Sequence, residues 1–191
     1  MAIKRQIGLR DFHVAKLLTD VAGSDPTYGS ITKIPGIISA NISIERSSET
    51  YMSDDTVEEV LSSLSSITVE VEVSNLSAAE RSLLLGQKTS AGVVASNVDD
   101  IANEVAIMFR SQKTNGAYRY ICLPKGKFSE PSENYASKTD SVTAQTLTMT
   151  FTGMQLASNG NYKISADSDD EDIEDDFINT FFTSVKFALP A

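Results

Sequence analysis

The chain has 191 residues, of which 41% are hydrophobic and 22% are charged, with a formal net charge of −10. This length suits one domain with room for an extension, and the composition is that of a globular protein. The acidic balance argues against a conventional nucleic-acid-binding surface, because such a surface needs clustered Lys and Arg to displace phosphate counterions. No apolar run is long enough for a membrane-spanning helix.

The first predicted elements are a loop and a strand. Residues 19–28 contain Gly23, Asp25 and Pro26, which are typical of an irregular connection. Residues 38–45 alternate between apolar and polar side chains, the pattern of a strand with one buried face. Residues 67–74 alternate in the same way. We therefore predict two strands whose polar faces carry Ser, Thr, Asn and Glu and no Lys.

Residues 47–66 separate these two strands and do not alternate. They are rich in serine and in acidic side chains. A long inter-strand loop is predicted here. Such loops are unusual inside a compact domain, are often functional, and can become ordered on binding.

A helix is predicted directly after the second strand. Ser77 and Glu80 have the spacing of a capping box, and Gly86 is placed to end the helix. Apolar residues between them form one stripe, so we expect this helix to pack against the strands.

A hairpin is predicted farther along the chain. Residues 104–110 and 118–123 have strand patterns, and Asn115-Gly116 between them is typical of a tight hairpin turn. The single cysteine, Cys122, falls in the second strand, where we expect a buried and unreactive thiol.

The C-terminal third begins with a threonine-rich strand predicted at residues 142–152, followed by a turn and a strand at residues 162–166. We divide the chain into a β domain of residues 1–163 and an acidic C-terminal extension of residues 164–191. Within the extension, apolar spacing predicts a helix at residues 173–185, although its last segment also permits a strand.

Two groups of residues in the sequence could serve catalysis. His13 is the only histidine and Asp11 is its nearest acid, but no nucleophile motif accompanies them. Glu70 and Glu72 share a strand face at a spacing compatible with glycoside hydrolysis. Their alternation with valine is nevertheless what any solvated strand face shows, and tryptophan is absent. We predict that the chain is not an enzyme.

Metal and cofactor motifs are incomplete. One Cys and one His are too few for a zinc site. Asp167, Asp169 and Glu171 match the first ligand positions of an EF-hand loop, but Asp172 and Ile178 stand where that loop needs Gly and Glu. No phosphate-binding glycine motif is present. The sequence predicts no metal and no cofactor.

Short motifs follow one another in order between residues 7 and 163. They are Ile7-Gly8-Leu9, Thr27-Tyr28-Gly29, Ile34-Pro35-Gly36, Tyr51-Met52-Ser53-Asp54-Asp55, Gly116-Ala117-Tyr118-Arg119-Tyr120, Lys125-Gly126-Lys127-Phe128 and the threonine-rich residues 144–150. In order and spacing they resemble the major tail proteins, or tail tube proteins, of siphophages, especially the group found in phages of Gram-positive bacteria.

The resemblance implies a mainly β fold, either a β-sandwich or a small barrel, with one flanking α-helix and a long inter-strand loop. It also implies a structural role: hexameric rings stack into a tail tube, and each subunit gives about four strands to a wall around the DNA. The implied partners are further copies of the chain, the tape measure protein, the tail terminator and the baseplate hub. The implied location is the virion tail, assembled in the host cytoplasm without a membrane.

A channel for DNA must let phosphate slide without binding it, and carboxylates and hydroxyls meet that need. The predicted lumen-lining residues are Ser39, Asn41, Ser43, Glu45, Thr68, Glu70, Glu72, Thr146, Thr148 and Thr150. The predicted inter-ring contacts, in the long loop, are Tyr51, Asp54 and Asp55.

Two other functions are also compatible with the sequence. A tailocin or a secretion-type device would use a tube protein that the sequence does not separate from a phage protein. A β-sandwich binding module, such as a carbohydrate-binding domain, is a different class of protein. The aromatic content of 7% and the absence of tryptophan weigh against it.

Overall fold

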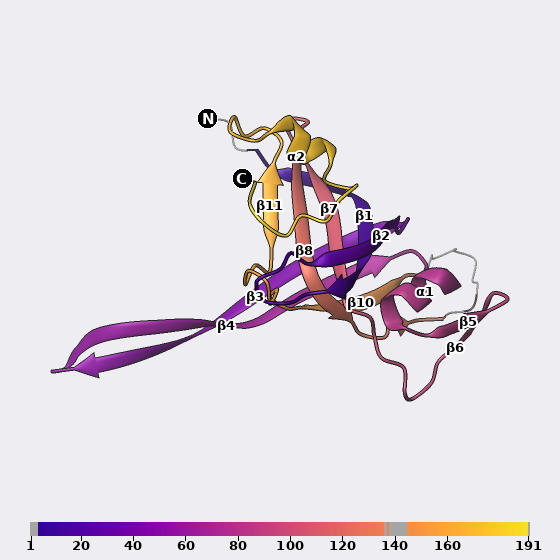
Figure 1. Ribbon diagram of the computed structural model, residues 1–191, viewed down its shortest axis with the longest axis horizontal. Helices are drawn as coiled ribbons and strands as arrows, with labels where there is room; N and C mark the ends of the chain where they lie inside the picture. The colour runs from indigo at the N-terminus through magenta and orange to yellow at the C-terminus, as the bar shows by residue number, and fades with distance from the viewer. Residues whose placement is uncertain (1–3, 136, 138–144, 191) are drawn as a thin grey trace.

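The computed structural model describes residues 4–135, 137 and 145–190. Nine strands form one antiparallel sheet in the order β2-β1-β7-β8-β10-β4-β3, with β11 paired to β8 and β9 paired to β10 (Figure 1). Their bounds are β1 Gln6–Thr19, β2 Thr27–Lys33, β3 Ile37–Ser53, β4 Thr56–Val73, β7 Val105–Lys113, β8 Tyr118–Phe128, β9 Ser132–Glu133, β10 Leu147–Gly153 and β11 Ile164–Asp167. The predicted mainly β sandwich is confirmed.

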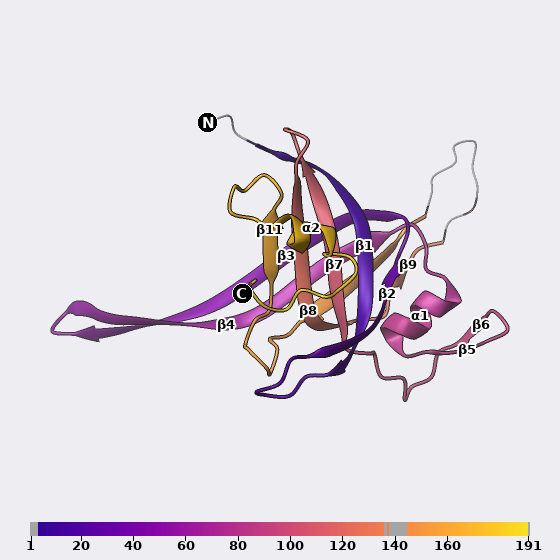
Figure 2. The ribbon, with the colours of Figure 1, turned by 45° about the horizontal axis from the view of Figure 1, so that its top comes forward.

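The sheet folds over itself because β8 changes partner along its length. Near its end, Phe128 pairs with Phe151 of β10, whereas nearer its start Cys122 pairs with Ile164 of β11. From this branch the strands β3, β4 and β10 run across β1, β7, β8 and β11 (Figure 2). Within the described residues the sheet stays open, with β2 and β3 as the ends of its strand order.

Two hydrophobic clusters occupy opposite faces of the β7–β8 region. The larger cluster lies inside the fold, where Val69 and Val71 of β4 and Phe151 of β10 meet Ile107 and Leu123. The smaller cluster lies outside, where the C-terminal segment covers residues of β7 and β8 that include Met108, Tyr120 and Cys122. The predicted burial of Cys122 is confirmed, and this burial raises the pKa of its thiol to about 12.

The helix α1 (Ala78–Leu85) packs Leu84 and Leu85 against the larger cluster. Its predicted cap is confirmed. The backbone N–H of Glu80 donates to Ser77 Oγ at 3.3 Å, and the N–H of Ser77 donates to Glu80 Oε2 at 2.6 Å. Gly86 ends the helix with a φ of 71°, a left-handed conformation that glycine adopts without strain.

Substituting Ser77→Ala is expected to lower the free energy of unfolding by about 1 kcal/mol, because the helix loses the acceptor that satisfies one of its free N–H groups. Urea denaturation measures the change. Ser82→Ala on the same helix is the matched control, since Ser82 holds no cap and alanine is the better helix former. Equal losses in both variants would contradict a capping role for Ser77.

The C-terminal segment differs in part from its prediction. The helix expected at residues 173–185 is shorter, since α2 spans only Asp175–Asn179. It ends where threonine hydroxyls bond to nearby carbonyls: Thr180 Oγ1 donates to the carbonyl of Asp176 at 2.6 Å. Such bonds compete with helix continuation. The aromatic spacing still predicted burial correctly, because Phe177 and Phe181 fill the smaller cluster. The described residues thus contain the flanking helix α1 and the short α2.

The predicted loop at residues 47–66 is wrong. β3 and β4 pair through this segment up to Ser53 opposite Thr56, and Asp54-Asp55 form the two-residue turn with φ values of 49° and 60°. This hairpin, residues 46–64, projects far from the rest of the molecule (Figure 1); we call it the arm. Both of its faces are exposed, so no burial imposes the alternation by which a strand is recognised.

Several other elements were only partly predicted. The hairpin turn at Asn115-Gly116 is confirmed between β7 and β8. The loop predicted at residues 19–28 lies between β1 and β2 but is shorter, because Thr19 ends β1 and Thr27 begins β2. The threonine-rich strand runs over Leu147–Gly153, and residues 142–144 of its prediction lie outside the described residues. The small hairpin of β5 (Lys88–Ser90) and β6 (Val93–Ala95) was not predicted, because three-residue strands carry too little pattern.

Candidate functional site: a polar sheet face and a protruding arm

Three adjacent strands bring the predicted lumen residues onto one face. The registers of β3, β4 and β10 place them in cross-strand rows: Ser39–Glu72–Thr148, Asn41–Glu70–Thr150 and Ser43–Thr68–Thr152. Glu45 lies opposite Ser66, and Thr146 extends the face just before β10 begins. All ten predicted residues thus gather on a single polar surface.

Burial on the opposite side of these strands fixes the direction of this polar face. Val69, Val71 and Val73 alternate with the polar residues of β4 and are fully buried in the larger cluster. Met149 and Phe151 of β10 behave in the same way. Since successive side chains of a strand point to opposite faces, the carboxylates and hydroxyls must point outward.

Hydroxyl groups hold the carboxylates of this face. Glu72 accepts a hydrogen bond from Thr146 Oγ1 at 2.7 Å and one from Ser39 Oγ at 3.3 Å. Glu45 accepts one from Ser66 Oγ at 3.2 Å. No Lys or Arg of the described residues forms an ion pair with these carboxylates or with Glu70. The face therefore keeps its negative charge.

Lysine borders this face on β8, a feature that the sequence patterns did not predict. Lys127 lies opposite Thr152 and so continues the row that starts at Ser43. Its Nζ lies 3.8 Å from Glu104, and Lys125 Nζ lies 2.8 Å from Asp20. The predicted absence of lysine from the polar faces of residues 38–45 and 67–74 holds for β3 and β4; the lysines stand on β8, where acidic neighbours offset their charge.

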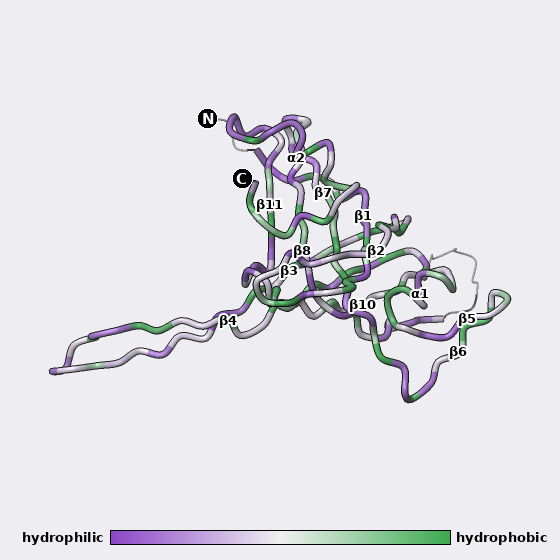
Figure 3. Tube along the Cα trace, viewed as in Figure 1, coloured by the Kyte–Doolittle hydropathy of each residue, from purple (hydrophilic) through white to green (hydrophobic). Residues whose placement is uncertain are grey.

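Two bulges on β4 set the faces of the arm. At its base Glu45 pairs with Ser66 and Arg46 with Leu64, so Ser65 is skipped. Near its tip Tyr51 pairs with Glu59 and Met52 with Val57, so Glu58 is skipped. One arm face therefore combines Thr50 and Met52 with Val60 and Val57. This apolar face continues the inward side of β3. Met52, Val57 and Val60 are 57–67% exposed, so the isolated chain leaves this apolar face uncovered. Figure 3 shows hydrophobic positions along the arm between polar ones.

The predicted inter-ring residues lie on the outer half of the arm. Asp54 and Asp55 form its turn, and Tyr51 lies on the opposite face from Met52, where its hydroxyl donates to Glu49 at 3.2 Å. Tyr51 is half exposed. These three residues are accessible to another molecule.

The side chains of His13 and Asp11 do not contact each other. The Asp11 carboxylate binds Lys33 and Arg110, whereas His13 Nδ1 contacts the backbone oxygen of Asp11 at 2.8 Å and its ring stacks on Phe182. His13 and Asp11 thus do not form the carboxylate–imidazole pair of a triad. In the part of the chain that the structure describes, no group of His, Cys, Asp and Glu is arranged to hold a metal ion. None of its helices is long and apolar enough to cross a membrane.

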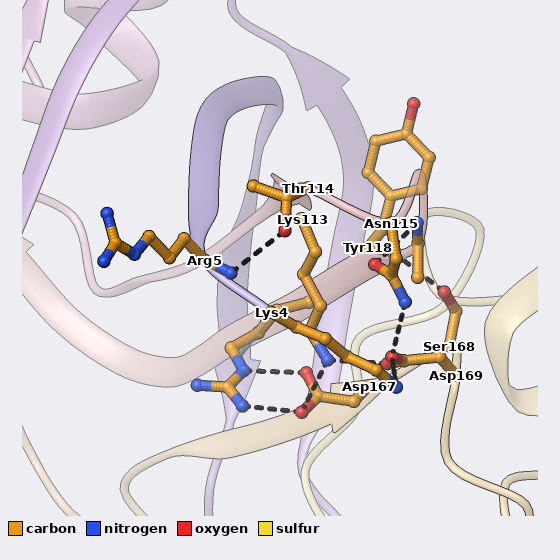
Figure 4. A network of polar contacts seen from close by, with 11 residues as sticks. Lys4, Arg5, Lys113, Thr114, Asn115, Tyr118, Asp167, Ser168 and Asp169 are labelled. Atoms are coloured by element: carbon orange, nitrogen blue, oxygen red, sulfur yellow. Dashed lines mark hydrogen bonds and ion pairs between the residues drawn. The ribbon is translucent and has the colours of Figure 1, made fainter. Parts of the chain in front are cut away.

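Ion pairs attach the start of the C-terminal segment to the β7–β8 hairpin. Asp167 binds Arg119 through two hydrogen bonds of 2.7 and 2.5 Å, and Asp169 binds Lys113 at 2.6 Å and Lys4 at 2.5 Å (Figure 4). The side chain of Lys113 is 7% exposed, so its charge depends on these partners. Hydrogen bonds from Arg119 hold the pKa of Asp167 below its ordinary value, and those from Lys113 do the same for the pKa of Asp169.

Acidification is expected to destabilise the protein through these aspartates. A carboxyl whose pKa is lowered by folding contributes stability above its unfolded value of about 3.9, and that contribution disappears as the pH falls through the folded value. Hydrogen bonding from Lys33 lowers the pKa of Asp11 in the same direction. Urea midpoints should therefore fall between pH 5 and pH 2. Asp167→Asn should lose about 1–3 kcal/mol at pH 7 and show a weaker pH dependence; an unchanged pH profile would contradict this.

The fold and this polar face define a structural β protein with an exposed arm. A model of the phage tail tube protein family matches residues 25–187. The chain therefore belongs to the phage tail tube protein family, a family of structural proteins of the virion tail. A search of the curated proteins found no match.

Proposed function

We propose that six copies form a ring whose channel is lined by the polar face of β3, β4 and β10. A closed cylinder needs sheet edges that can join, and β3 is an edge strand of 17 residues. On the other side of β10, the end of β8 and the short β9 together make a fourth strand of this wall. The β3 edge of one subunit would then join the β9 side of its neighbour.

The single observation that supports this proposal is the unpaired negative charge of the face. Glu70, Glu72 and Glu45 have hydroxyl neighbours and no cation partner among the described residues. A wall of this kind repels phosphate and offers nothing for counterion exchange, so DNA passes without specific binding.

The arm supplies the contact between stacked rings in this proposal. It carries exposed apolar side chains and ends in Asp54-Asp55, far from the rest of the subunit. Tyr51, Asp54 and Asp55 contact the next ring. The ends of the tube meet the tail terminator and the baseplate hub, and the tape measure protein occupies the channel before DNA does. The function requires no catalysis.

Negative-stain electron microscopy of the purified protein tests the assembly. At high protein concentration we expect rings whose class averages show six-fold symmetry, or tubes of constant diameter. A protein that stays monomeric over a wide range of concentration and salt, also in the presence of its tail initiator complex, would contradict the proposal.

A further inference from the structure

A groove with an apolar floor opens between β1, β3 and the β7–β8 hairpin. Its volume is about 550 Å³, and its floor includes Leu9, Phe109 and Ile121. Ile38 and Ile42 of β3 line the other wall, and Ile38 is 48% exposed. Phe109 and Ile121 are themselves buried, so the apolar surface that stays open to solvent in the groove belongs to the half-buried Leu9 and Ile42 and to the exposed Ile38.

The charged residues that line the groove are both basic. Lys163 and Arg119 belong to its lining, which contains no acidic residue. Arg119 is held by Asp167. Lys163 forms no ion pair with the part of the chain that the structure describes, so its charge is available to a ligand.

The arm has the complementary composition. Residues 47–63 carry five acidic side chains and no basic one, and Glu58 and Glu59 lie beside the exposed Val57 and Val60. The arm of the same chain does not fill the groove. Its paired strands lead away from Ile42 and extend outward from the molecule (Figures 1 and 2).

We propose that the groove receives the apolar face of the arm of a second copy. Met52, Val57 and Val60 then cover the floor, and Glu58, at the bulge beside Val57, lies against Lys163. Arm and groove are different surfaces of one chain, so the contact is head-to-tail and repeats without limit, as a tube requires. The inference rests on the proposed tube function and deepens it by naming the surface that the arm contacts.

Cysteine cross-linking tests the contact directly. Cys122 is fully buried, so the parent protein is an inert background for thiol chemistry. A variant with Val57→Cys and Ile38→Cys is treated with a short bismaleimide. The length of this cross-linker tolerates a small error in the position proposed for the arm in the groove. The matched control combines Val57→Cys with Val93→Cys, because Val93 is 67% exposed on β6, on the opposite side of the molecule from the arm (Figure 1).

A ladder of covalent multimers from the Val57/Ile38 variant, absent from the control, is the expected result. A ladder from the control alone, equal ladders from both, or no ladder from either would overturn the groove assignment. The ladder is read on denaturing gels and does not require tubes. Failure of the tube proposal is seen separately, as the absence of rings and tubes in electron microscopy of the parent protein.

Charge exchange gives a second, independent test. Lys163→Glu alone and Glu58→Lys alone should each abolish assembly at concentrations where the parent assembles. Combining both substitutions in one chain should restore assembly, because the attraction returns with opposite signs. Normal assembly of the Lys163→Glu variant, or no recovery in a combined variant that is folded by circular dichroism, would overturn the proposal.

Discussion

Replacing residues 47–63 by Asn-Gly is expected to give a folded subunit that no longer forms tubes. Arg46 pairs with Leu64, so a two-residue type I′ turn can close the hairpin at that pair. The removed segment is exposed on both faces, and its loss should change the free energy of unfolding by less than about 1 kcal/mol. Assembly, in contrast, should be lost, because the uncovered Met52, Val57 and Val60 are removed.

Thermal unfolding by circular dichroism and electron microscopy of the same sample separate the two effects. The matched control keeps the arm and changes only serines within it, Ser48→Ala and Ser62→Ala, which face each other across the arm. That variant should assemble. Tubes of normal diameter and spacing from the shortened variant would show that the arm does not join the rings.

Reversing the charge of the polar face should impair DNA passage without preventing assembly. Changing Glu70 and Glu72 to Lys shifts the net charge of each subunit from −10 to −6 and places ammonium groups where the channel wall is proposed to be. Phosphate would then bind by counterion release. We expect virions with tubes of normal appearance and a loss of DNA ejection of at least about tenfold, because each new phosphate contact strengthens binding at low salt.

Two controls make this result specific. The neutral pair Glu70→Gln and Glu72→Gln should have a smaller effect, since it removes repulsion without adding attraction. Asp25→Lys and Asp99→Lys make the same change of net charge at two exposed positions away from the polar face and should leave ejection unchanged. Ejection measured on purified virions that equals the parent level in the Glu70/Glu72 variant would show that these residues do not line the channel.

Local patterns in the sequence predicted the parts of the fold that a buried face controls. Residues 38–45 and 67–74 alternate because the larger hydrophobic cluster accepts only one of their faces. The cap at Ser77 and the turn at Asn115-Gly116 were predictable because each depends on a few adjacent residues and their backbone conformations. The outward direction of Glu70 and Glu72 follows from the same alternation.

The arm and the C-terminal segment could not be read in this way. The arm is exposed on both faces, so its strands lack the periodicity that burial imposes. The short α2 is limited by hydroxyl–carbonyl bonds and by packing on Tyr120, whose position depends on β8. Asp167 lies in the acidic C-terminal extension, and its pairing with Arg119, 48 residues away, has no local sequence signal.

The alternating patterns predicted a β-rich chain with acidic and hydroxyl-bearing strand faces, and the short motifs resembled those of the tail tube family. That these faces form one surface follows from the strand pairing of the folded chain. Glu72 lies between Ser39 and Thr148 because β3, β4 and β10 pair in one register, and registers between distant segments are set by the shared core rather than by local composition. The groove beside Lys163 has the same origin, since its walls come from strands that meet only in the folded chain.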